Sequence, residues 1–110
     1  VGVNSNSSVA RYKPGRPIND ELDRAELVAS IRYVDYVVIF GEPDPREFLG
    51  RIKPDYHIKS KGGYTGIEKD VVESNGGQII LLDDLPGYST SEILAKAAKS
   101  LLSEIKANGF

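Results

Sequence analysis

Three neighbouring hydroxyl groups near the C-terminal end of the sequence are well placed to bind an anion. Ser89, Thr90 and Ser91 follow an apolar run at 78–82 that is typical of a buried strand, and they precede an apolar stripe with helical spacing that starts at Ile93. They therefore stand where a helix begins, and a helix N-terminus carries unpaired N–H groups that accept phosphate. Serine and threonine are also ordinary helix caps, so the cluster alone leaves capping and phosphate binding open.

Basic residues near the N-terminal end could supply the complementary charge. Arg11, Lys13, Arg16 and Arg24 lie within fourteen residues of one another, around a Pro-Gly turn. A guanidinium group matches the geometry of phosphate oxygens, although a solvated basic loop is the commoner arrangement. This segment is therefore a candidate clamp on phosphate groups.

A polar segment follows the N-terminal apolar residues. Asn4 and Ser5 open a stretch over 4–17 that we predict to be a long loop, because asparagine and serine favour turns. In a parallel sheet this loop lies at the carboxyl end of its strand, where α/β proteins bind ligands. Asn4 and Ser5 therefore open a loop that we expect to lie at a ligand-binding edge of the sheet.

A second loop follows a later strand and contains Lys59, Lys61, Gly62 and Gly63. Its glycines permit close approach of the backbone to a ligand. The sequence matches neither the dinucleotide pattern nor the Walker pattern, so the loop alone is a weak signal. The loop is therefore a candidate for contact with a ligand whose class its residues do not specify.

Two other features are better explained by structure than by chemistry. His57 is the only histidine and lies in or beside a strand, with no base partner or nucleophile close to it in the sequence, so we interpret it as a structural or rim residue. Asp83 and Asp84 could bind a metal ion, but acidic turns before Pro-Gly are common. We assign no metal ligand from the sequence.

The elements that must position these residues alternate between strands and helices. Strands are predicted at 1–3, 35–40, 55–59 and 78–82, and helices at 20–32, 46–52, 67–74 and from the hydroxyl cluster to Asn108-Gly109. We predict an α/β domain over 1–110 with a Rossmann-like, mostly parallel sheet and helices on both faces. The helix at 20–32, capped by Asn19, has a wide apolar arc that predicts close packing. The loops at 4–17, 59–66 and 83–91 should meet at one edge, an arrangement that suits a nucleotide or a sugar phosphate.

The composition is that of an ordinary globular domain. Of the 110 residues, 40% are hydrophobic and 27% are charged, the net charge is -2, and cysteine is absent. Without an excess of positive charge, the sequence does not favour nucleic acid or an acidic membrane as a partner. It contains no apolar run long enough to span a membrane and no thiol for a disulfide or a metal site. We expect a cytoplasmic protein.

An ordered set of motifs resembles a known family. The set consists of Val1-Gly2-Val3-Asn4-Ser5, Gly15-Arg16-Pro17-Ile18-Asn19, Asp23-Arg24-Ala25-Glu26-Leu27, Val34-Asp35-Tyr36-Val37-Val38-Ile39-Phe40, Lys53-Pro54-Asp55 and Gly87-Tyr88-Ser89-Thr90-Ser91. It resembles the cytidylyltransferase-like nucleotidyltransferases and is most similar to the heptose 1-phosphate adenylyltransferase domain.

The resemblance implies that AMP or CMP is transferred from ATP or CTP to a sugar phosphate, with Mg²⁺ bridging phosphate oxygens. It also implies roles for the candidate residues. Ser89, Thr90 and Ser91 would hold the β- and γ-phosphates, and Asn4, Ser5, Arg16 and Arg24 would face the sugar phosphate or the triphosphate. Lys59, Lys61, Gly62 and Gly63 would lie near the nucleotide.

Two departures from the family pattern accompany this resemblance. The His-x-Gly-His signature is absent, and the Lys-Gly-Gly-Asp-Tyr motif is altered, because Ser60 and Lys61 intervene and the aspartate is missing. The catalytic residues therefore stay unassigned. The sequence also opens inside an apolar segment without methionine, from which we expect a further strand and helix of about 30–40 residues, the size of one βαβ step. We expect that strand to lie between strands 1–3 and 36–40.

The chain alone should then be inactive, and its exposed sheet edge could pair with a second copy as a homodimer. Two alternatives remain at this point. One is a non-catalytic α/β module that binds nucleotide or phosphate, and the other is an interaction domain whose hydroxyl cluster only caps a helix.

Overall fold

Four short strands form two separate parallel pairs. The computed structural model describes residues 1–109. Strand β1 (Gly2–Asn4) pairs with β2 (Val38–Phe40), and β3 (Tyr56–Ser60) pairs with β4 (Gln78–Leu82). Gly2 lies opposite Val38 in the first pair, and Tyr56 opposite Gln78 in the second. Parallel neighbours need a crossover connection, and helices supply it within each pair. The predicted α/β class with parallel strands is therefore confirmed.

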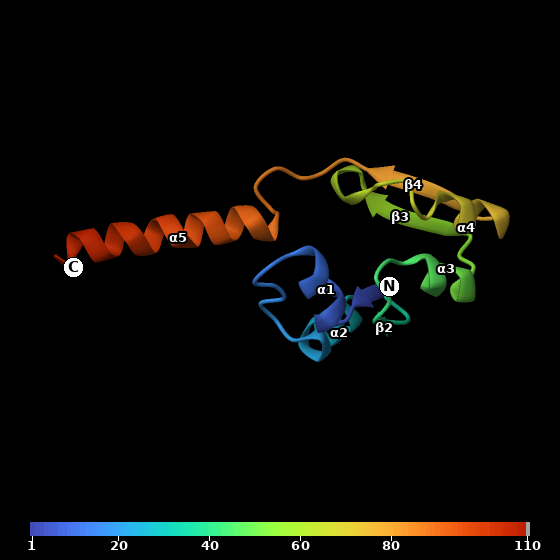
Figure 1. Cartoon of the computed structure of the whole chain (residues 1–110), viewed down its shortest axis with the longest axis horizontal. Coiled ribbons are helices and arrows are strands. Elements are labelled where there is room, and N and C mark those ends of the chain that lie inside the picture. Colours follow the sequence, from blue (N-terminus) through green and yellow to red (C-terminus); the bar gives the residue numbers. More distant parts are fainter. Residues whose placement is uncertain (110) are drawn as a thin grey trace.

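The helices between β1 and β4 connect these strands, and two of them pack against the strand pairs (Figure 1). Helix α2 packs beside β1 and β2, while α4 packs beside β4 and α3. The helices are α1 (Asn6–Tyr12), α2 (Glu21–Ala29), α3 (Arg46–Ile52), the short 3₁₀ helix η1 (Lys61–Gly63), α4 (Lys69–Ser74) and α5 (Thr90–Ala107).

The hydrophobic core is small and lies where β1, β2 and α3 meet. Phe40 is buried there, and its ring stacks on that of Phe48 with the centroids 5.2 Å apart. The other buried apolar side chains are Val3 on β1, Leu49 on α3 and Val72 on α4. A Cβ atom on Gly2 would lie 2.7 Å from the Phe48 ring. The glycine is therefore what allows the aromatic ring to close over the strand.

The gap in the sheet is not where the sequence analysis placed it. We expected strands 1–3 and 36–40 to be separated by a further strand, but β1 and β2 pair directly. Within residues 1–109 the gap lies instead between β1 and β3, which have no pairing with each other. The separation of the strands into two pairs therefore leaves one edge of β1 and one edge of β3 without a neighbouring strand.

Two local predictions were wrong. The segment at 4–17 is not a continuous loop, because α1 forms within it and is capped by the Ser5 side chain, which accepts a hydrogen bond from Ser8 N at 3.2 Å. Helix α2 is capped by Asp20, not Asn19, ends at Ala29, and contains no buried residue. A sheet of two three-residue strands offers too narrow a face to cover the wide apolar arc of α2.

Helix α5 projects from the rest of the molecule (Figure 1). The molecule measures 61 × 30 × 27 Å, and α5 contains no buried residue. Leu101 and Leu102 are 57% and 60% exposed, so the apolar stripe of this helix has no cover within the described chain. The helices of residues 1–109 lack the length or the apolar character needed to cross a membrane.

Candidate active site

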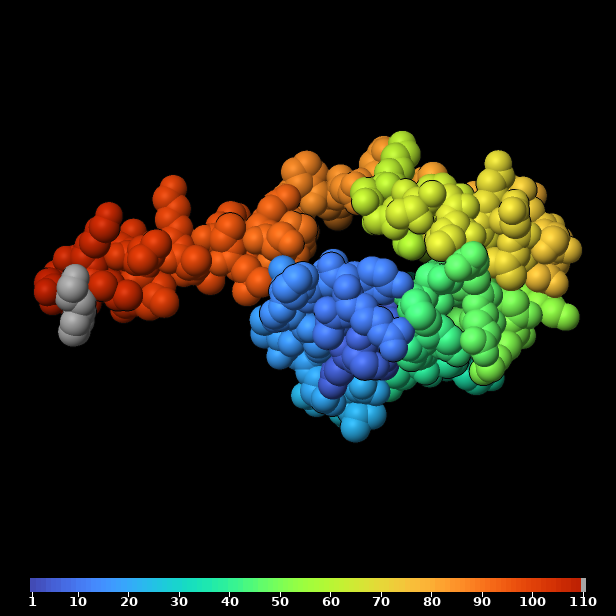
Figure 2. Space-filling model, in the orientation of Figure 1, coloured from blue at the N-terminus to red at the C-terminus, as the bar shows by residue number. Residues whose placement is uncertain are grey.

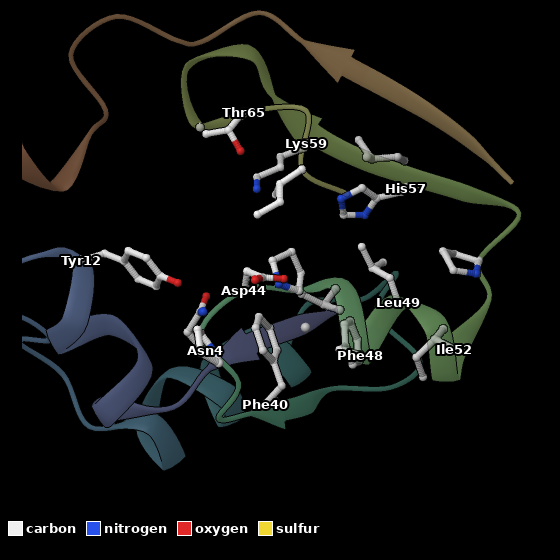
Figure 3. Close-up of a pocket in the computed structure, with 18 of the residues that line it drawn as sticks. Asn4, Tyr12, Phe40, Asp44, Phe48, Leu49, Ile52, His57, Lys59 and Thr65 are labelled. Atoms are coloured by element: carbon white, nitrogen blue, oxygen red, sulfur yellow. The ribbon is translucent and has the colours of Figure 1, made fainter. Parts of the chain in front are cut away.

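A cavity of about 800 Å³ separates the two strand pairs. Its size falls within the usual range of ligand sites. Asn4, Tyr12 and Asp44 lie along one wall, and His57, Lys59 and Thr65 lie along the other (Figure 3). The space-filling view shows the opening between the N-terminal part of the chain and the β3–β4 part (Figure 2).

The cavity combines an apolar region with a polar one. Phe48, Leu49 and Ile58 are among its apolar lining residues. Asn4 ends β1 and Lys59 lies near the end of β3, so polar groups gather beside the carboxyl ends of strands. Ligands of open α/β sheets bind at such strand ends, which makes the polar region the candidate site.

The two residues predicted at the end of β1 have different surroundings. Asn4 lines the cavity, and its side-chain amide donates a hydrogen bond to Ser8 Oγ at 3.1 Å. Ser5 caps α1, and its hydroxyl also lies 3.1 Å from the hydroxyl of Ser7. Asn4 can therefore meet a ligand, whereas the hydroxyl of Ser5 is already engaged in local structure.

The basic segment reaches the hydroxyl cluster through one contact. Arg16 Nη2 donates a hydrogen bond to Ser91 Oγ at 3.3 Å, across 75 residues of sequence. Ser89 caps α5, because its hydroxyl accepts from Glu92 N at 3.1 Å. Ser89, Thr90 and Ser91 are all exposed. The structure thus brings Arg16 to the start of α5. Neither Arg16 nor the three hydroxyl residues line the cavity.

Arg24 is separate from that group. Its Nε donates to Asn19 O at 3.0 Å, and its Nη2 donates to Asn6 Oδ1 at 3.1 Å. These contacts tie α2 to the start of α1. Arg24 does not line the cavity, so the structure gives it a connecting position between two helices.

The loop after β3 is held by the two acids that follow β4. Lys61 Nζ donates to Asp83 Oδ1 at 2.6 Å, and Gly62 N donates to Asp84 Oδ2 at 3.0 Å. A Cβ atom on Gly62 would lie 2.5 Å from that Asp84 oxygen, so the close approach depends on glycine. Gly63, the next residue, lines the cavity. The segment at 83–91 therefore contacts both other polar segments, at 59–66 and at 4–17.

A buried carboxylate supports the β3 wall of the cavity. The Glu68 side chain is fully buried, and its Oε1 accepts a hydrogen bond from Lys59 Nζ at 3.0 Å and lies 3.4 Å from His57 Nε2. Burial alone would raise the pKa of the Glu68 carboxyl. The hydrogen bond from Lys59, with smaller contributions from backbone, charge and His57, outweighs burial and leaves that pKa below its ordinary value.

The cavity also contains a carboxylate that is already neutralised. Arg46 donates to both oxygens of Asp44, through Nε and Nη2, each at 2.9 Å. These side-chain hydrogen bonds, followed by one from the Arg46 backbone, hold the pKa of Asp44 below its ordinary value. The negative charge on this wall is therefore balanced.

Sequence reasoning missed Glu68, Tyr12 and Asp44 as neighbours of the site. His57 does have a carboxylate partner, which lies eleven residues away in the sequence. The sequence did contain a signal of this partner, because His57 and Lys59 are two residues apart and therefore lie on the same face of β3. Two polar residues on the half-buried face of a strand require a buried polar partner, but the strand alone does not identify which residue provides it.

The described residues offer no ready-made metal site. Among residues 1–109, no group of three or more His, Asp or Glu side chains is arranged to hold an ion. Asp83 and Asp84 are engaged with Lys61 and Gly62. Residues 1–109 therefore show no cluster of side chains already arranged around an ion.

Sequence comparisons identify the relatives of this chain. Residues 1–96 match the family described as Cytidylyltransferase-like. Curated relatives include proteins named "Bifunctional protein HldE" from Rhodopseudomonas palustris (strain BisA53), 44% identical over 101 residues, and from Syntrophotalea carbinolica, 40% identical over 100 residues.

These alignments cover 88% and 87% of this chain, respectively, and 20% of each relative. The chain thus spans about a fifth of the length of the relatives that it matches. Nucleotidyl transfer is the general chemistry that the family match and these relatives support. With 96 of its residues matched by the family and its parallel α/β architecture in place, the chain belongs to the cytidylyltransferase-like family.

Proposed function

We propose that this chain is part of an enzyme that transfers AMP, or CMP, from a nucleoside triphosphate to a sugar phosphate such as heptose 1-phosphate. The main support is the junction of the three polar segments, where Arg16 contacts Ser91 and the 59–63 segment contacts Asp83 and Asp84. Cations and hydroxyls from distant parts of the sequence thus meet in this junction, although Arg16 and Ser91 do not themselves line the cavity. The resemblance of the sequence motifs to the heptose 1-phosphate adenylyltransferase domain favours a sugar phosphate as the acceptor and ATP as the donor.

The proposed reaction forms one bond and breaks one. An oxygen of the sugar phosphate attacks the α-phosphorus of the triphosphate, the bond from the α-phosphorus to the bridging oxygen breaks, and pyrophosphate leaves with the electron pair. Little covalent work falls to the protein in such a transfer, so positioning and charge stabilisation dominate. Cationic side chains near the phosphates are the residues to test.

The proposed roles follow the placement of each group. Arg16, with Ser91 and Thr90 at the start of α5, takes the β- and γ-phosphates, because guanidinium and hydroxyl donors suit phosphate oxygens. Lys59 and Asn4 take the part of the substrates that enters the cavity. Mg²⁺ would arrive bound to the triphosphate oxygens, as it does where proteins offer few ligands.

We also propose that the described chain is the larger part of one domain. The edges of β1 and β3 that face the gap have no strand partner among residues 1–109, and the apolar region of the cavity separates them. A further strand in this gap would join the two pairs into one sheet. Without it the cavity walls are not fixed, so the chain alone should be inactive. A second copy of the chain could instead occupy the open strand edges.

We also propose a cytoplasmic location, which suits both substrates.

Calorimetry and a pyrophosphate-release assay test the proposal on the product of the complete coding sequence. ATP with Mg²⁺ should bind, and pyrophosphate should appear only with a sugar phosphate. Arg16→Gln should weaken ATP binding about tenfold, the loss of one charge-assisted hydrogen bond. Arg51→Gln is the matched control, because Arg51 is exposed on α3 and pairs with Glu47, and it should bind ATP normally.

The outcomes separate the candidate functions. Binding of ATP or CTP without pyrophosphate release would favour the non-catalytic nucleotide-binding module. Equal effects of the two arginine substitutions would remove Arg16 from the site. The absence of heat with any nucleotide would leave only a capping role for the hydroxyl cluster.

A further inference from the structure

Glu68 is unusual among the charged residues of this chain. It is fully buried, as are the side chains of Val72 and Ser8 within residues 1–109. Charged side chains are almost never fully buried unless they are paired. Glu68 is the N-cap residue of α4, but its side chain makes no capping hydrogen bond to the helix. Its burial therefore requires another explanation.

The explanation lies in the two β3 residues above it. Lys59 Nζ donates to Glu68 Oε1 at 3.0 Å, and His57 Nε2 lies 3.4 Å from the same oxygen. The side chains of Lys59 and His57 are 31% and 17% exposed, and both line the cavity (Figure 3). Glu68 thus lies behind two residues that face the space where a ligand would enter.

The chemistry of the cluster leaves hydrogen-bond donors available. An ammonium group has three N–H donors, and the contact with Glu68 uses one of them. An ionised carboxylate can only accept, so a hydrogen bond between His57 and Glu68 requires the proton on His57 Nε2. Glu68 Oε2 is buried without a protein partner. The carboxylate is therefore held in place without its own oxygens reaching the cavity.

We infer that Glu68 is a positioning residue, which holds the Lys59 ammonium and the His57 imidazole at the cavity wall so that Lys59 meets the phosphate chain of the bound nucleotide. This inference rests on the proposed nucleotidyl transfer. A free lysine side chain is flexible, and fixing it before the ligand arrives lowers the cost of binding. The opposite wall supports an anionic ligand there, because Lys13 lines it and Asp44 is already paired with Arg46.

A double-mutant cycle on the product of the complete coding sequence tests this role, with ATP and inorganic tripolyphosphate as probes in calorimetry. Lys59→Met should weaken ATP binding about 10- to 100-fold, and Glu68→Gln about 3- to 10-fold, as expected for interactions of charged groups. In the Lys59→Met background, Glu68→Gln should add almost nothing, because Glu68 acts through Lys59. Glu68→Ala should lose more affinity than Glu68→Gln, which keeps an acceptor for Lys59.

Glu73→Gln is the matched control, since Glu73 lies on α4, the helix that Glu68 precedes, and is exposed. It should bind both probes as the wild type does. Equal ATP affinity of the wild type and a folded Glu68→Gln variant would overturn the inference. It would also be overturned if Glu68→Gln weakened ATP binding in the Lys59→Met background as much as in the wild type. Failure of the wild type to bind either probe would instead overturn the proposed function and this inference together.

A second measurement needs no substitution at Glu68. The imidazole nitrogen signals of His57, assigned by their loss in His57→Gln, should shift when tripolyphosphate is added to the wild-type protein. Signals that stay in place at saturating tripolyphosphate would place the cluster outside the phosphate site and overturn the inference, even if every Glu68 variant failed to fold.

Discussion

Glu68 links the site to the response of the protein to acid. Its pKa lies below the ordinary value of 4.5, because the hydrogen bond from Lys59 and smaller contributions outweigh the effect of burial. A carboxyl whose pKa is lower in the folded state stabilises the protein above its unfolded pKa, and that contribution is lost as the pH falls through the folded pKa. The contribution should therefore be complete near neutral pH and disappear well below pH 4.5.

Thermal unfolding from pH 7 down to pH 3 checks this prediction. The wild type should be more stable than Glu68→Gln at pH 7, and the difference should shrink once the pH falls below about 4.5. Asp20 also has a lowered pKa, from the Asn6 hydrogen bond first and then from the Leu22 backbone, but it titrates in both proteins and cancels. A difference that stays constant over the whole range would contradict the assignment to Glu68.

Ser8 is a second residue whose environment predicts a measurable effect. Its side chain is fully buried, its hydroxyl donates to Glu42 O at 3.0 Å, and it accepts from the Asn4 amide at 3.1 Å. Ser8→Ala would leave both partners without this contact, so we expect the free energy of unfolding to fall by about 1–3 kcal/mol. Chemical denaturation measures this loss. Ser7→Ala, at an exposed position of the same helix, should change it by less than about 0.5 kcal/mol.

The candidate residues could be predicted from the sequence only in part. Ser89 and Arg16 stood out by residue type, and the structure places Arg16 against the neighbouring Ser91. Glu68 did not stand out, because its importance comes from burial beneath β3, and burial depends on how α4 packs. Local sequence identifies groups that could do chemistry, whereas their partners are set by tertiary contacts.

At the scale of elements, replacing two different glycines by alanine should have opposite effects on stability. Gly77 is buried at the start of β4, and a Cβ atom there would collide with Pro54 O and lie 3.0 Å from Val72 Cγ1. Gly50 lies within α3, and its Cβ atom would meet Val71 Cγ2 at an ordinary 3.6 Å. Gly77→Ala must therefore push apart the connections that lead into β3 and β4, while Gly50→Ala only restricts the unfolded chain.

Denaturation of both variants checks this comparison. We expect Gly77→Ala to lower the free energy of unfolding by about 1–3 kcal/mol, the usual cost of overpacking. Gly50→Ala should raise it by about 0.5–1 kcal/mol, because alanine is the better helix former. Equal effects of the two substitutions would show that the contact between Gly77 and Pro54 does not constrain the fold.

The elements themselves were predicted unevenly. Strand β4 and helix α3 have the predicted bounds, because continuous apolar runs and a proline at the helix start are local signals. Helix α1 was missed because its first residues, Asn6, Ser7 and Ser8, are poor helix formers. Tertiary contacts override that preference, since Asn6 N donates to Glu21 Oε1 at 3.0 Å and Ser8 is anchored to Glu42.

At the scale of the whole molecule, the backbone hydrogen bonds of the two strand pairs show which amides of β1 and β3 point away from their partners. Ser5 N donates to Phe40 O, and Val38 N donates to Val1 O. Alternate residues of a parallel strand bond to the same neighbour, so the amides of Gly2 and Asn4 face the gap. In the other pair, Gln78 N donates to Asp55 O, which by the same alternation turns the amides of Tyr56 and Ile58 away from β4.

Hydrogen exchange can therefore report whether a strand fills the gap. In the 110-residue chain, the amides of Asn4 and Ile58 should exchange quickly, while those of Val3 and His57, which face their strand partners, should be protected. In the product of the complete coding sequence all four should be protected, because a strand between β1 and β3 would accept from both edges. Unchanged fast exchange at Asn4 and Ile58 would leave the two pairs as separate sheets, with a ligand cavity that nothing closes, and the proposal of a single completed domain would fail.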